Sequence, residues 1–167
     1  LQGFYEYYEG NHRGLVGYRG LEDADGTRYG GDMGEAWCSE FYSWVADHAL
    51  DGLGHRSSVS RMVNYFDGEG AGVHNPSLYK VKYKLRRGDY VGEDTSGDGE
   101  KNHSAMFLAY DKALDAIWTL DGNSHGYDVE PTLSGANRQA GNEATIRLRD
   151  TSVVLYWGRI GRSPLKD

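Results

Sequence analysis

Residues 35–50 read EAWCSEFYSWVADHAL and contain Cys38, the only cysteine of the 167-residue chain. Polar side chains recur along one side of this segment at spacings of three and four, and aromatic and aliphatic side chains occupy the rest. The pattern predicts a helix that is buried over most of its surface. Asp32 followed by Glu35 is typical of a capping box, so Cys38 is expected in the first or second turn.

The place of the cysteine in this helix favours a chemical role. The positive end of the helix dipole and the free backbone N–H groups of the first turn stabilise a thiolate. The alternative is that Cys38 is a small buried hydrophobic residue, which is the common role of a lone cysteine. A nucleophile at this position would need a base from elsewhere in the chain.

Length and composition predict one domain over residues 1–167, with a core that needs no metal or disulfide. Lys and Arg number 18 against 25 Asp and Glu, and the net charge is −7. We therefore expect no nucleic-acid or anionic-membrane partner, because no basic patch stands out. No apolar run is long enough to span a membrane. Leu1 is not a native start, so we expect that a signal peptide or another domain preceded it.

Helical patterns precede strand patterns along the chain. Residues 57–66 predict a second helix with serine caps and one apolar stripe, and residues 71–78 predict a loop in which His74 has no assigned role. The later segments predict strands or extended chain, namely Tyr79–Leu85, Arg87–Val91, His103–Tyr110, Ala116–Asp121, Thr145–Arg149 and Val153–Trp157. This order predicts an α+β domain with N-terminal helices packed on an antiparallel sheet of about five strands.

Two acidic turns are candidates for calcium binding. One contains Asp23 and Asp25, and the other contains Asp94 and Asp98. Hard cations prefer several oxygen ligands, but Ala105 stands where an EF-hand loop has its bidentate glutamate. We expect solvated acidic turns and no required cofactor, with calcium as the weaker alternative.

A base and its orienting group are predicted from the hairpin formed by residues 103–121. In an antiparallel hairpin the start of one strand lies beside the end of the next, so His103 should lie near Asp121 or Asn123. Together with Cys38 these residues supply a nucleophile, a base and an orienting group. The alternatives are a surface histidine, a simple Asp-Gly-Asn turn, or His125 as the base.

Four ordered segments resemble the papain-like hydrolases of the NlpC/P60 superfamily, most closely the CHAP branch of cysteine amidases and peptidases. They are WCSEFYSW at 37–44, RGDYV at 87–91, HSAMFL at 103–108 and LDGN at 120–123. They are similar to the nucleophile helix, the Gly-Asp strand entry, the histidine strand and the acid-x-Asn ending of that family. Together they span about half of the chain.

The resemblance implies a papain-like fold in which Cys38 is the nucleophile and His103 the general base. Asn123 matches the orienting residue of the family, and Asp121 matches the acid two positions before it. Many relatives have a tyrosine three residues before a Gly-Gly pair, whereas Thr27 holds that place here. A role for Tyr29 in the oxyanion site is therefore left open, and the backbone N–H of Cys38 is the expected donor.

By the same resemblance we expect an exported cysteine amidase or endopeptidase that acts on the peptide part of bacterial peptidoglycan, in the periplasm, the cell wall or outside the cell. The alternative is a non-catalytic module on the same fold that uses tyrosines and tryptophans to bind sugar or peptide. The Cys38, His103 and Asn123 set favours the enzyme.

Overall fold

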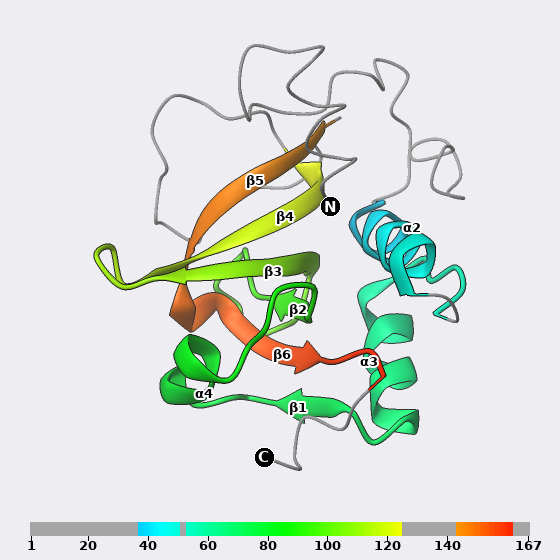
Figure 1. The fold of residues 1–167 in the computed structure, drawn as a ribbon, viewed down its shortest axis with the longest axis horizontal. Helices are drawn as coiled ribbons and strands as arrows, with labels where there is room; N and C mark the ends of the chain where they lie inside the picture. The colour runs from blue at the N-terminus through cyan, green and yellow to red at the C-terminus, as the bar shows by residue number, and fades with distance from the viewer. Residues whose placement is uncertain (1–36, 51–52, 125–142, 162–167) are drawn as a thin grey trace.

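The computed structural model describes residues 37–50, 53–124 and 143–161, which form an α+β arrangement (Figure 1). The helices are α2 (Cys38–Leu50), α3 (Val59–Gly68) and α4 (Leu78–Tyr83), with a 3-10 turn η3 (Thr151–Val153). The strands are β1 (Gly72–His74), β2 (Tyr90–Glu93), β3 (His103–Asp111), β4 (Ala116–Ser124), β5 (Glu143–Asp150) and β6 (Val154–Gly158). None of the described helices is long and apolar enough to cross a membrane.

Within the described residues the strands form one six-stranded sheet in the order β1-β6-β2-β3-β4-β5. Every neighbouring pair is antiparallel, as the sequence predicted. β2, β3 and β4 follow one another in the chain, whereas β6 enters between β1 and β2. The sheet therefore brings the chain's last described strand beside the strand that precedes His103.

The sheet packs on both faces because successive side chains of a strand point to opposite sides. One core contains Tyr90, Met106 and Leu120 of the sheet, and it includes Phe41 of α2 and Phe66 of α3. A second core gathers the alternate residues of the same strands with residues of α4 and of the segment just after it. Its members include Val91, Ala105, Ile117, Trp157, Val81 and Leu85. Hence α2 and α3 cover one face of the sheet and α4 covers the other.

The predicted strand or extended segment Tyr79–Leu85 is wrong, because helix α4 (Leu78–Tyr83) covers most of it. The sequence alternates apolar residues with lysine, which favoured a strand. In the structure Ser77 caps the helix by accepting a hydrogen bond from the Lys80 N–H, and only Val81 and Leu85 of the segment are buried. These two residues are four apart, which is the spacing of one helix face.

The predicted loop at residues 71–78 is also corrected, since it contains the short edge strand β1, which pairs with β6. His74 at its end shares a hydrogen bond with the Asp67 carboxylate through Nε2 at 3.0 Å, so it has a partner that the sequence did not indicate. Three residues are too few for a periodic pattern to be read. The other strands predicted from His103 onward and the two earlier helices are confirmed within a few residues. The predictions for residues 1–34 lie outside the described chain.

Candidate active site

Cys38 is the first residue of α2 and is almost fully buried. The next residue, Ser39, shares a hydrogen bond of 2.7 Å with the Ser104 hydroxyl, which in turn bonds the Tyr90 hydroxyl at 2.8 Å. This buried hydroxyl chain ties the first turn of α2 to β3 and β2. It therefore fixes the start of α2, where Cys38 lies, against the residue that follows His103.

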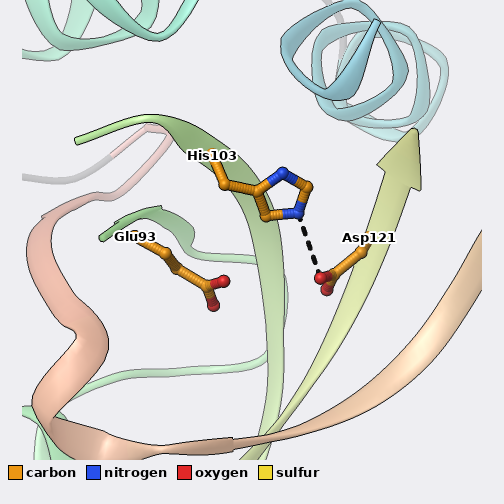
Figure 2. A group of neighbouring side chains, drawn as sticks. All are labelled: Glu93, His103 and Asp121. Atoms are coloured by element: carbon orange, nitrogen blue, oxygen red, sulfur yellow. Dashed lines mark hydrogen bonds and ion pairs between the residues drawn. The ribbon is translucent and has the colours of Figure 1, made fainter. Parts of the chain in front are cut away.

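His103 begins β3 and bonds the carboxylate of Asp121 on β4, with 3.0 Å between Nε2 and Oδ2 (Figure 2). The register pairs Asp121 with Ala105, two residues along β3 from the histidine. Residues two apart on a strand share a face, so the histidine and the carboxylate project to the same side. The predicted proximity of His103 and Asp121 is confirmed.

Cys38 and His103 interact closely enough that each shifts the pKa of the other, through hydrogen bonding and charge. Asp121 occupies Nε2, so Nδ1 is the ring nitrogen that remains for the sulfur. Figure 2 shows that the second ring nitrogen points away from Asp121 and toward helix α2. The three side chains thus form one series in which the imidazole is held from both sides.

Electrostatics favour the ionised form of the cysteine–histidine pair. Burial raises the pKa of the Cys38 thiol, but the hydrogen bond and charge of His103 and the backbone N–H of Ser104 outweigh it and bring the pKa below its ordinary value. Burial lowers the pKa of His103, but the hydrogen bonds to Asp121 and to Cys38 raise it to about 10. Both pKa shifts therefore favour a thiolate beside an imidazolium over the neutral pair.

Arg149 on β5 is a second cation on the same carboxylate, and no sequence motif indicates its place in the site. Its Nη2 donates to Asp121 Oδ2 at 2.6 Å. Burial raises the pKa of Asp121, but the Arg149 charge and the His103 hydrogen bond together hold it well below its ordinary value. Asp121 is therefore an anion that accepts from both neighbours.

Glu93 on β2 completes the buried group. It lies opposite His103 in the strand register, and its Oε2 is 3.4 Å from Arg149 Nε. Neither carboxylate oxygen accepts a hydrogen bond, and burial raises the pKa of Glu93 to about 7. The pairing of β2 with β3 brings Glu93 to the site, and no pattern in the sequence around Glu93 predicts this position.

The buried group contains three side chains of the types that bind metal ions. One ligand atom from each of Glu93, His103 and Asp121 lies within 4.8 Å of the others. Arg149 already places a positive charge beside both carboxylates, and His103 shares its Nε2 with Asp121. A divalent cation would meet the guanidinium charge there, so the arrangement fits an ion network better than a metal ion.

Most of the other predicted site residues have side chains outside the described part of the structure. Asn123 lies on β4, but its side chain is outside what the structure describes, as are His125, Tyr29, Asp23 and Asp25. The Asp94 carboxylate accepts hydrogen bonds from backbone N–H groups of its own loop, those of Ser96, Gly97, Asp98 and Gly99. Backbone donors thus satisfy its oxygens, and calcium binding stays a prediction.

A scan against protein-family models finds no match for the chain, and neither the curated proteins nor the solved structures contain one. A buried thiol at a helix start, an imidazole held on both sides and a carboxylate that accepts from two cations can together carry out acyl transfer.

Proposed function

We propose that the chain is a cysteine amidase or endopeptidase of papain-like fold, and that its substrate is the peptide part of bacterial peptidoglycan. The observation that carries the proposal is the buried series Cys38–His103–Asp121, with the thiol at the start of α2. The resemblance of the four sequence segments to the CHAP branch supports the substrate class, which rests on analogy.

In the proposed reaction the Cys38 thiolate attacks the carbonyl carbon of an amide. The negative charge that develops on the carbonyl oxygen is met by the backbone N–H of Cys38, because the first N–H groups of a helix have no partner within it. His103 then gives its proton to the leaving amine, and a thioester forms. His103 next takes a proton from water, which attacks the thioester and releases the acid and the thiolate. Asp121 keeps the imidazole in one orientation throughout.

The test is digestion of purified peptidoglycan by the wild type and by Cys38→Ala, with the products identified by mass spectrometry. We expect new amino and carboxyl termini in stem or bridge peptides with the wild type and none with Cys38→Ala. His103→Ala should be equally inactive. His74→Ala is the matched control, since His74 also bonds an aspartate but belongs to the exposed end of β1.

Two results would contradict the proposal. Cleavage of glycan bonds alone would show a different chemistry, and full activity in Cys38→Ala would show that the thiol is incidental. If no bond is cut in several wall types but the wild type and Cys38→Ala both sediment with peptidoglycan, the binding-module alternative replaces the enzyme.

A further inference from the structure

A second surface, at α4 and the turn between β3 and β4, exposes large apolar side chains. The large hydrophobic residues that are exposed in the described part of the chain all lie here, at Leu78 (51%), Tyr79 (63%), Tyr83 (53%) and Leu114 (48%). Single exposed hydrophobic residues are ordinary, but a group of them marks an interaction surface. We call these four residues, with the exposed basic residues around them, the α4 patch.

Contacts between α4 and the turn make the patch continuous. The Tyr79 and Tyr83 rings lie 5.2 Å apart, and Tyr83 contacts Tyr110 of β3 at 5.7 Å. Lys82 forms an ion pair of 2.6 Å with Asp115, the neighbour of Leu114. The two segments therefore present one surface, although about thirty residues separate them in sequence.

The charge of the patch is opposite to that of the whole chain. Residues 78–87 contain five of the 18 Lys and Arg residues and no Asp or Glu, in a chain whose net charge is −7. Four of these basic residues are exposed, namely Lys80, Lys84, Arg86 and Arg87. The local charge thus corrects the expectation from composition that the chain has no basic patch.

The acids of the neighbouring turn do not cancel this charge. Asp115 is engaged by Lys82 and by the Tyr110 hydroxyl. Asp111 accepts the backbone N–H groups of Ala113 and Leu114 and so shapes the turn. With these two acids, Lys112 and the exposed Asp150, which pairs with Ala116 in the strand register, included, the surface contains six basic and three acidic side chains. The patch is positive around an apolar centre.

We propose that the α4 patch docks the protein on the surface of an anionic lipid bilayer. Tyrosine and leucine side chains enter the region between headgroups and acyl chains, and lysine and arginine pair with anionic headgroups at the same depth. Both kinds of side chain are needed for stable attachment, and both are present within one patch.

A soluble polyanion such as a single-stranded nucleic acid fits the patch less well. Bases stack on aromatic rings that are open on one face along a basic groove. Here the Tyr79 and Tyr83 rings are tilted by 47° to one another, so they form no common flat face, and Leu78 and Leu114 have no ring on which a base could stack. The leucines gain from a bilayer, which removes their surface from water.

Docking at this patch would place the bilayer on the side of the molecule away from the candidate active site. Figure 1 places α4 and the β3–β4 turn on the left of the molecule, whereas α2, with Cys38 at its start, is on the right. The long axis of the molecule is horizontal in this view. The inference stands apart from the proposed enzyme activity and can be tested without a substrate.

The test is co-sedimentation of the full chain with vesicles of phosphatidylcholine alone and of phosphatidylcholine mixed with an equal part of phosphatidylglycerol. We expect binding to the mixed vesicles at low salt and much weaker binding to the neutral ones. Each basic residue near an anionic surface contributes roughly fivefold to binding, so Lys80→Gln/Lys84→Gln should weaken it by about tenfold or more. Lys84→Gln alone should weaken binding roughly fivefold. Arg61→Gln is its matched control, since it removes an exposed charge of α3.

Tyr79→Gln tests the apolar half of the proposal. It leaves the charge unchanged, and we expect it to weaken binding to mixed vesicles severalfold while binding to a soluble oligonucleotide does not change. No binding to the mixed vesicles would overturn the proposal. Equal losses in Arg61→Gln and Lys84→Gln would also overturn it, as would binding that Tyr79→Gln leaves intact, which would indicate a polyanion surface without lipid insertion.

Discussion

Asp121 is the residue through which the candidate site is held together, because its Oδ2 atom accepts from both His103 and Arg149. A buried carboxylate without such partners would take up a proton rather than stay charged. With two cations beside it, Asp121 remains an anion, so it can keep the His103 imidazole protonated. The thiolate of Cys38 in turn depends on that imidazolium.

The first prediction concerns the ionisation of Cys38. Because its thiol pKa is lowered, alkylation by iodoacetamide followed against pH should show an inflection below about 8.5, the value of an ordinary thiol. His103→Gln removes the hydrogen bond and the charge that oppose the effect of burial, so the inflection should rise by roughly one unit or more. His74→Gln should leave the inflection where it is in the wild type. An inflection at about 8.5 in the wild type would contradict a lowered pKa of Cys38.

The second prediction concerns Arg149, whose charge holds down the pKa of Asp121. In Arg149→Met the acid limb of the pH–activity profile should move to higher pH, and stability should fall by about 3 kcal/mol as a buried pair loses one partner.

Arg159→Met is the control for this experiment. Arg159 is equally buried and pairs with Asp89 through two nitrogens, at 3.0 and 2.8 Å. The Arg159→Met variant should lose a similar amount of stability, while the acid limb of its pH–activity profile stays in place. If the two variants have the same profile, Arg149 stabilises the fold without tuning the site.

At the level of elements, the site depends on the close approach of α2 to β4. A Cβ atom added at Gly122, next to Asp121, would overlap Phe41 of α2. The same relation recurs between Gly158 of β6 and Phe66 of α3. Glycine at each position lets a helix pack directly on the sheet backbone.

The third prediction uses this pair of glycines. Gly122→Ala and Gly158→Ala should each cost about 2 kcal/mol, because overpacking forces the helix from the sheet. Only Gly122→Ala should also lower the turnover of the folded protein, by about tenfold or more, because it moves Cys38 relative to Asp121. Urea unfolding and amidase assays of both variants measure the two effects. Equal turnover would show that α2 adjusts without displacing the thiol.

How far sequence predicts an element depends on whether its signals are local. Helix α2, the caps of α3 and the hairpin that joins His103 to Asp121 have local signals, and all three are confirmed. Helix α4 was missed because alternating lysine imitates a strand when both sides of the segment are mostly exposed. Arg149 and Glu93 could not be predicted, since the pairing of β5 with β4 and of β2 with β3 is set by long-range register.

At the scale of the whole molecule, one sheet separates a buried charged group at one end from a basic and apolar surface at the other. The net charge of −7 indicates neither feature, because a sum over the whole chain does not show where the charges of the ion network and of the α4 patch lie. The buried group also couples the folding of the whole domain to pH, through three side chains whose pKa values change on folding.

The direction of this coupling follows for each group. His103 has a folded pKa of about 10 against 6.5, so its stabilisation is present below pH 6.5 and is lost as the pH rises toward 10. Asp121 has a lowered pKa, so its stabilisation is present above 3.8 and is lost as the pH falls further. Glu93 has a raised pKa of about 7 against 4.5, so stability falls as the pH rises between these values. The combined contribution of these three side chains is therefore most favourable at about pH 4 to 5.

The fourth prediction follows from Glu93, which alone of the three acts between pH 4.5 and 6.5. In wild type the free energy of unfolding should begin to fall above about pH 4.5, by at most about 3 kcal/mol by pH 7 from this residue. Glu93→Gln has no carboxylate to ionise in the core, so its plateau should extend to about pH 6.5, where His103 begins to act. Glu69→Gln, which changes an exposed glutamate, should follow the wild-type curve. Urea unfolding across this range measures all three proteins. A decline that begins at the same pH in Glu93→Gln and wild type would mean that Glu93 is ionised in the folded protein at pH 4.5, and that Arg149 compensates its burial in full.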